Sequence, residues 1–120
     1  MSEERYREQR RQLARFARRK SCRIVGRPPE RPSEWRPESV IDPETKQPFT
    51  PAGAWEFIAD VLDNKPEIPL ETVTLRRPQG RTAYVLKVPL QEKLLYIKLE
   101  LGTNVVIGRS FHYSHYDVQP

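Results

Sequence analysis

From residue 70 onward, the sequence alternates apolar and polar residues in four short segments that are separated by turn signals. This period of two predicts β-strands over residues 71–77, 81–89, 93–101 and 105–113. Turn residues fill each gap: Pro78-Gln79-Gly80, Leu90-Gln91-Glu92 and Gly102-Thr103-Asn104. Connections this short join antiparallel neighbours, because a parallel pair needs a crossover of about a dozen residues or more. The sequence therefore predicts a four-stranded antiparallel meander.

The third strand indicates which face of this sheet is buried. One of its faces is entirely apolar and the other is mixed: Leu95, Ile97, Leu99 and Leu101 against Leu94, Tyr96, Lys98 and Glu100. We expect a helix to cover the apolar face. Lys87 of the second strand should then share the open face with Lys98.

The position of Arg109 depends on the last turn. A two-residue turn places Arg109 beside Lys98, whereas a three-residue loop places it opposite Ile97. We favour the first register, because it avoids a buried guanidinium without a partner. It also aligns Gly108 with the helix, where a glycine permits close approach.

A core helix is predicted to begin after Thr50. Threonine is a good N-cap, and Pro51 is tolerated at the first helical position. Apolar residues then recur at spacings of three and four until residues 63–66 end the run: Ala54, Trp55, Phe57, Ile58, Val61 and Leu62. The predicted fold class is α+β, with one core helix packed on the antiparallel sheet.

Residues 1–49 are predicted to form a basic arm and residues 50–120 the folded domain. Residues 2–20 have helical character, but their apolar stripe is thin: Tyr6, Leu13, Ala14, Phe16 and Ala17. The helix is therefore expected either to be frayed in solvent or to order on a nucleic acid or partner protein.

Prolines dominate residues 26–51, which we expect to be extended over the surface of the domain. The apolar residues of this segment, Trp35, Val40, Ile41 and Phe49, are expected to anchor it by packing.

Charge is divided unevenly along the chain. Residues 1–37 hold 12 Arg or Lys and 5 acidic residues, net +7, whereas residues 38–120 hold 9 and 11, net −2. A basic segment of this kind most often binds nucleic acid, although an anionic protein surface or solubility alone also explains it. The candidate nucleic-acid-binding residues are Arg10, Arg11, Arg15, Arg18, Arg19, Lys20, Arg76, Arg77, Arg81 and Lys87.

Cys22 is the only cysteine, which excludes an intramolecular disulfide and a cysteine-based zinc site within one chain. We expect a cytoplasmic protein, because the sequence shows neither the apolar region of a signal peptide nor the roughly 20 apolar residues of a membrane span. The small core favours a homodimer or a protein partner.

Residues 108–116 give the strongest local signal for chemistry, since they contain both histidines, an arginine and two tyrosines. RNA cleavage without a metal needs a proton acceptor, a proton donor and fixed cations. The candidate catalytic residues are Tyr96, Lys98, Arg109 and His112. We expect no cofactor and no metal, because no acidic pair flanks the histidines at ligand spacing. A serine hydrolase is disfavoured because a nucleophile elbow is missing. The alternative is a polar edge strand that faces water.

The third and fourth predicted strands contain the segments Tyr96-Ile97-Lys98-Leu99, Val105-Val106-Ile107 and Ser110-Phe111-His112. Together these segments resemble the closing hairpin of MqsR-type toxins of the RelE superfamily, which are bacterial type II toxin–antitoxin ribonucleases. In these toxins, a tyrosine-x-lysine strand precedes a short apolar strand that ends in serine-phenylalanine-lysine. The resemblance implies helices followed by an antiparallel sheet, endoribonuclease activity and an antitoxin partner. Tyr96 would take the place of the family's active-site tyrosine and His112 that of its lysine. The family's upstream lysine and glutamine have no aligned counterpart.

The leading hypothesis is therefore an mRNA interferase that acts on mRNA or at the ribosome and pairs with an acidic antitoxin. A second hypothesis is a non-catalytic nucleic-acid- or ribosome-binding module whose arm supplies affinity. A third is a protein-interaction module whose basic helix binds an acidic partner.

Overall fold

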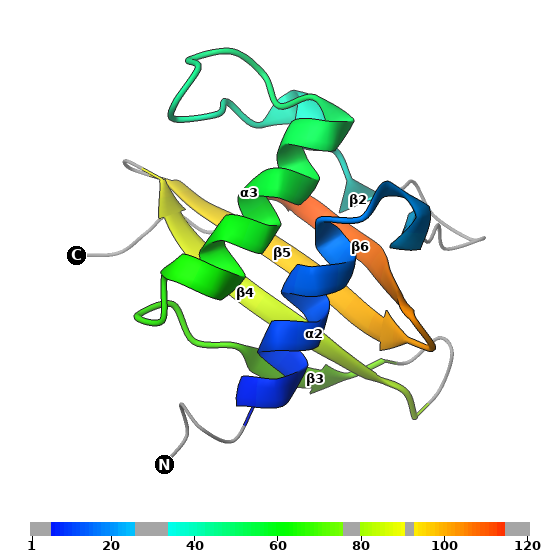
Figure 1. The fold of residues 1–120 in the computed structure, drawn as a ribbon. Coiled ribbons are helices and arrows are strands. Elements are labelled where there is room, and N and C mark those ends of the chain that lie inside the picture. Colours follow the sequence, from blue (N-terminus) through cyan, green and yellow to red (C-terminus); the bar gives the residue numbers. More distant parts are fainter. Residues whose placement is uncertain (1–5, 26–33, 76–79, 91–92, 115–120) are drawn as a thin grey trace.

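The computed structural model describes residues 6–25, 34–75, 80–90 and 93–114. Two helices lie side by side on one face of a six-stranded sheet, which makes a two-layer α+β fold (Figure 1). The elements in chain order are α2 (Arg7–Ala17), the 3-10 helix η1 (Lys20–Cys22), β1 (Arg23–Val25), β2 (Glu34–Trp35), the 3-10 helix η2 (Pro37–Ser39), α3 (Pro51–Asn64), β3 (Glu71–Thr74), β4 (Thr82–Leu90), β5 (Lys93–Gly102) and β6 (Val105–Tyr113).

The core helix α3 begins where the sequence predicts. The Thr50 side chain accepts a hydrogen bond from the Gly53 amide at 2.9 Å, and Pro51 is the first helical residue. The buried face of α3 consists of Ala54, Trp55, Ile58, Ala59, Val61 and Leu62. This face packs against apolar side chains of the sheet, among them Leu86, Ile97 and Phe111.

The four predicted strands pair in the predicted order, β3-β4-β5-β6, and all three pairs are antiparallel. The expectation of a sheet limited to these strands was wrong. Strands β1 and β2 both pair with β6 in parallel, so the sheet is mixed. Their pairing covers the edge that β6 would otherwise expose, and an exposed edge carries unpaired backbone groups.

Trp35 anchors strand β2 to the core. Its ring lies 4.8 Å from that of Trp55 and 5.6 Å from that of Phe111, measured between centroids. A Cβ atom at Gly108 would lie 2.5 Å from the Trp35 ring. The close approach expected at Gly108 therefore exists, but it accommodates Trp35 and not the core helix.

Two of the other predicted anchors also pack into the core, since Val40 is fully buried and Phe49 is 3% exposed. Ile41 does not, because 45% of its surface remains exposed.

Helix α2 docks on the protein itself, which neither sequence-based expectation anticipated. Leu13, Ala14 and Ala17 are at most 1% exposed, and α2 lies against α3 and strand β6. Residues on both sides of position 50 therefore contribute to one core. No helix in the described part of the chain is long and apolar enough to cross a membrane.

Arg10 links α2 to α3. Its guanidinium donates hydrogen bonds to four backbone carbonyl oxygens at 2.7–3.1 Å, those of Val61, Leu62, Lys65 and Ile68. Val61 and Leu62 belong to the last turn of α3 and Lys65 and Ile68 follow it, so Arg10 caps the C-terminal end of the helix. Burial lowers the pKa of Arg10, while Glu67 and Asp63 oppose this shift.

Candidate functional site

The face of the sheet opposite the helices gathers the candidate catalytic side chains. Lys87 of β4 pairs in register with Tyr96 of β5, which pairs with His112 of β6. Lys98 lies one step along the same face and pairs with Ser110. Directly opposed residues have Cβ atoms about 5 Å apart, so these five side chains form one cluster, which we call the open-face cluster.

The rings of Tyr96 and His112 are stacked, with centroids 5.7 Å apart and planes inclined by 29°. The Nδ1 atom of His112 lies 2.8 Å from the backbone carbonyl oxygen of Tyr113. A carbonyl oxygen only accepts, so Nδ1 carries the proton. In the neutral ring, Nε2 is therefore the basic nitrogen.

Glu34 of strand β2 joins this cluster, and sequence analysis missed it. Its carboxylate accepts a hydrogen bond from the Ser110 hydroxyl at 3.1 Å and lies 3.8 Å from Nε2 of His112. The parallel pairing of Glu34 with Ser110 brings the two residues together across 76 positions of sequence. No local pattern around Glu34 marks this contact, because it depends on the tertiary pairing of a two-residue strand.

Burial raises the pKa of the Tyr96 phenol, and the negative charges of Glu34 and Glu71 raise it further. Tyr96 is therefore a neutral hydrogen-bond donor at physiological pH. Lys87 is paired with Glu71 at 3.5 Å. Lys98 is half-buried and forms no ion pair within the described residues, which leaves its ammonium group for an anionic ligand.

The position of Arg109 on strand β6 differs from the predicted one. The two-residue turn is present, since Gly102 pairs with Val105, but the register shifts by one residue between Lys98 and Leu99. The predicted two-residue turn is confirmed, but the predicted position of Arg109 beside Lys98 was wrong, because Ser110 is the partner of Lys98. Arg109 is the extra residue of a β-bulge, which re-aims its side chain.

The Arg109 guanidinium binds the carboxylate of Glu100, which is 1% exposed. Arg81 binds the same carboxylate at 3.0 Å. A buried carboxylate requires such partners because an isolated buried charge is very costly. Arg109 thus stabilises Glu100, and this ion pair engages its guanidinium.

The described residues contain no group of three or more His, Cys, Asp or Glu side chains that could hold a metal ion. A serine-hydrolase arrangement is also missing from the open-face cluster. The Ser110 hydroxyl donates to the Glu34 carboxylate, so the acid and not the imidazole is its partner. The cluster is better suited to proton transfer beside fixed positive charge.

The predicted nucleic-acid-binding residues fall into three groups. Arg10 is committed to the α3 cap, and Arg18, Arg81 and Lys87 form ion pairs with Asp63, Glu100 and Glu71. Arg76 and Arg77 lie outside the described residues, as does His115. The exposed remainder, Arg11, Arg15, Arg19 and Lys20, lies on or just beyond α2.

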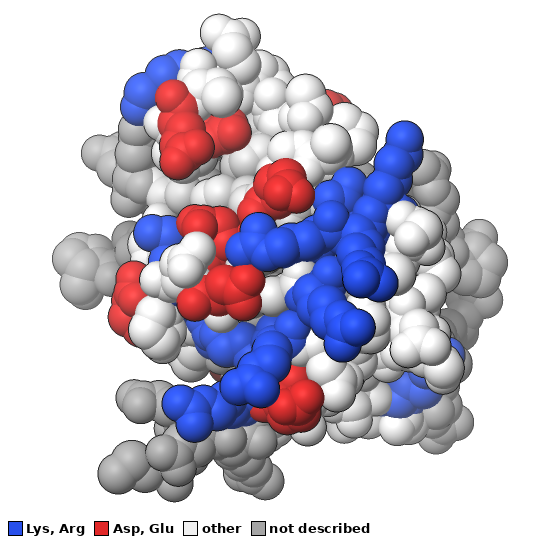
Figure 2. Space-filling view, in the orientation of Figure 1, with Lys and Arg blue, Asp and Glu red and all other residues white. Residues whose placement is uncertain are grey.

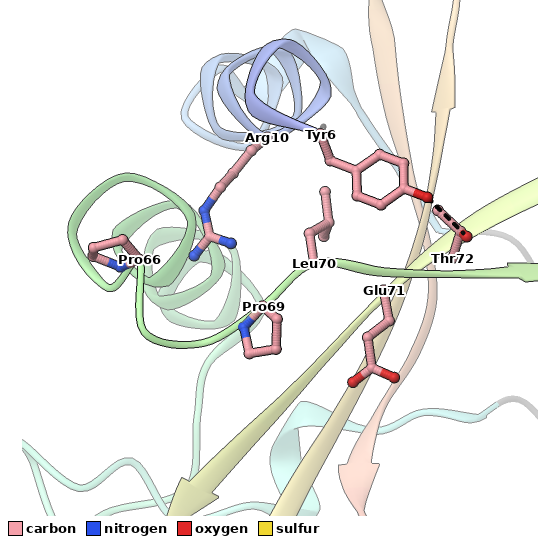
Figure 3. A pocket seen from close by; sticks show the side chains of 7 residues that line it. All are labelled: Tyr6, Arg10, Pro66, Pro69, Leu70, Glu71 and Thr72. Carbon is pink, nitrogen blue, oxygen red and sulfur yellow. Dashed lines mark hydrogen bonds between the residues drawn. The ribbon is translucent and has the colours of Figure 1, made fainter. Parts of the chain in front are cut away.

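A cavity of about 340 Å³ lies between α2, the segment after α3 and the start of β3 (Figure 3). Its lining is Tyr6, Arg10, Pro66, Pro69, Leu70, Glu71 and Thr72. The Arg10 guanidinium points to the α3 cap, and Glu71 points away from the Tyr6 ring. With these groups engaged elsewhere, the cavity offers little to orient a charged ligand.

No family model, no curated protein and no solved structure matches this chain.

Proposed function

We propose that the protein is an RNA-cleaving enzyme, an mRNA interferase of the RelE-like type, whose active site is the open-face cluster. The observation that carries the proposal is the stacked pair Tyr96 and His112 with Lys98 beside it on the same face. The resemblance of residues 96–112 to MqsR-type toxins supports the same assignment.

In the proposed reaction, the 2′-oxygen of a ribose attacks the adjacent phosphorus and the bond from phosphorus to the 5′-oxygen breaks. Nε2 of His112 accepts the proton of the 2′-hydroxyl, and Tyr96, which burial and nearby acids keep neutral, donates a proton to the leaving 5′-oxygen. Lys98 stabilises the charge on the phosphorane. The products are a 2′,3′-cyclic phosphate and a 5′-hydroxyl.

Glu34 stabilises the imidazolium that forms on His112 in this scheme, because it lies 3.8 Å from Nε2. The His112 side chain is only 8% exposed. The proposal therefore requires that RNA binding expose the ring further.

The test is cleavage of single-stranded RNA in EDTA by the wild-type protein and by His112→Ala, Tyr96→Phe and Lys98→Ala. We expect losses of about 100- to 10,000-fold for His112→Ala, in the range of general acid–base catalysis. Lys46→Ala, an exposed lysine outside the cluster, is the matched control. RNA with a single 2′-deoxy substitution at the scissile position should resist cleavage.

The proposal is overturned if the wild-type protein does not cleave RNA, if it cleaves the 2′-deoxy position, or if His112→Ala retains full activity. In cells, induced expression should arrest growth, and His112→Ala should relieve the arrest. A gene for an acidic antitoxin beside this one would support the assignment.

A second candidate function is a non-catalytic RNA-binding module. The observation that favours it is the ion pair between Arg109 and Glu100. This ion pair engages one of the two candidate catalytic cations, Arg109 and Lys98, that were expected at the scissile phosphate. RNA binding without cleavage would identify this function.

A further inference from the structure

Helix α2 presents a line of arginines to solvent. Arg7, Arg11 and Arg15 recur every four residues, so they lie on one side of the helix about 6 Å apart along its axis. Arg19 follows at the same interval just beyond the helix, and all four are exposed. Positive side chains form a band over α2 in the space-filling view (Figure 2). We call these four residues the arginine stripe.

The arginine stripe is distinct from the cations that stabilise the fold. Arg10 caps α3, Arg18 pairs with Asp63 at 2.8 Å, and Arg23 donates to the Ala17 carbonyl oxygen at 2.7 Å. Within the described residues, Arg7, Arg15 and Arg19 form no ion pair. Arg11 has one, to the exposed Glu8 at 3.8 Å, and exposed pairs of this kind contribute little.

The composition of this surface indicates the chemistry of its ligand. Leu13, Ala14 and Ala17 of α2 face the core, so the stripe has no buried apolar centre of the sort that protein interfaces use. The aromatic side chains next to the stripe, Tyr6 and Phe16, pack against the core, which disfavours their use as stacking platforms for unpaired bases. Guanidinium groups alone suit phosphates, which they bind through paired donors.

We propose that the arginine stripe docks the phosphate backbone of double-stranded RNA without reading its sequence. The choice of RNA over DNA rests on the proposed function. The stripe lies on the helical side of the molecule and the open-face cluster on the other side of the sheet (Figure 1). The duplex bound by the stripe is therefore a different part of the RNA from the phosphate that is cleaved.

The test measures binding of a labelled RNA duplex of about 20 base pairs to the full-length protein by fluorescence anisotropy over a range of salt concentrations. The variant Arg7→Gln/Arg11→Gln/Arg15→Gln removes three cations and keeps good helix formers. The control Arg36→Gln/Lys46→Gln/Lys93→Gln removes the same charge at three exposed positions outside α2. Circular dichroism melting verifies that both variants fold.

We expect the stripe variant to lose affinity about tenfold or more near 0.1 M salt, and the slope of log affinity against log salt to become shallower by about three. The control should stay close to wild type. Cleavage of a short single-stranded RNA should be unchanged in the stripe variant, which separates this proposal from the proposed function.

Equal losses in the stripe variant and the control would overturn the proposal, as would a wild-type protein that binds no RNA duplex, whatever its cleavage activity. Tighter binding to polyglutamate than to the duplex would assign the stripe to an acidic protein instead. Tighter binding to a DNA duplex of the same sequence would overturn the assignment to RNA.

Discussion

The phenol of Tyr96 experiences three influences that all favour its neutral form: burial, the charge of Glu34 and the charge of Glu71. A tyrosine whose pKa is raised on folding stabilises the protein fully below the pKa of the unfolded chain, about 10. That contribution is lost as the pH rises through the higher folded pKa. Stability should therefore decline above about pH 10 more steeply in wild type than in Tyr96→Phe.

The variant Glu34→Gln should lower the pKa of Tyr96, because it removes the larger of the two carboxylate effects while leaving burial unchanged. The pKa is measured by nuclear magnetic resonance of the assigned Tyr96 ring. Glu71→Gln is the matched comparison and should cause a smaller decrease. An unchanged pKa in Glu34→Gln would show that β2 does not hold this carboxylate near the phenol.

At the level of elements, the contact of α2 with α3 depends on the Arg10 cap. Arg10→Ala removes four hydrogen bonds to carbonyl oxygens at this end of α3, of which those of Val61 and Lys65 keep a backbone donor, and should destabilise the protein by about 2 to 3 kcal/mol. Arg11→Ala, one position along the same helix, should change stability by less than about 0.5 kcal/mol. Urea unfolding of both variants measures the difference. Similar values for the two would mean that solvent replaces the Arg10 cap at no cost.

Periodicity could predict α3 and the strands β4, β5 and β6 to within one residue at most boundaries, because each has a long, one-sided apolar pattern. It could not predict β1 and β2. Strands of three and two residues have no measurable period, and they exist only because β6 offers them an edge. Glu34 was missed because it lies on the two-residue strand β2. Arg109 illustrates a related limit, since a one-residue bulge leaves no trace in the alternation of β6.

At the level of the whole molecule, the basic arm identified by charge is part of the core. A chain of residues 38–120 lacks Leu13, Ala14 and Ala17, which are at most 1% exposed, and it also lacks Trp35. Burying one large apolar side chain contributes about 1.5–3 kcal/mol, and whole domains are stable by only about 5–15 kcal/mol. We therefore expect this fragment to show no cooperative unfolding transition in urea.

Leu13→Ala in the full-length protein removes a single buried side chain of the arm and should lower the free energy of unfolding by about 3 kcal/mol. If the fragment unfolds cooperatively and gives dispersed amide resonances, the arm is dispensable for folding. Either result bears on RNA-binding experiments, because loss of binding on truncation assigns affinity to the arm only when the remaining fragment is folded.

Strand β6 pairs with β5 on one side and with β1 and β2 on the other, so it lies inside the sheet although it is translated after every other described strand. The partners Arg23 and Val106 are 83 positions apart (106 − 23). During synthesis, β1 and β2 therefore have no partner strand in the sheet until β6 has been made. Sequence-distant pairing of this kind slows folding and prolongs the exposure of apolar surface. The basic helix α2 is made before α3, its main packing partner, so its arginines spend that interval next to the ribosome, itself a large polyanion.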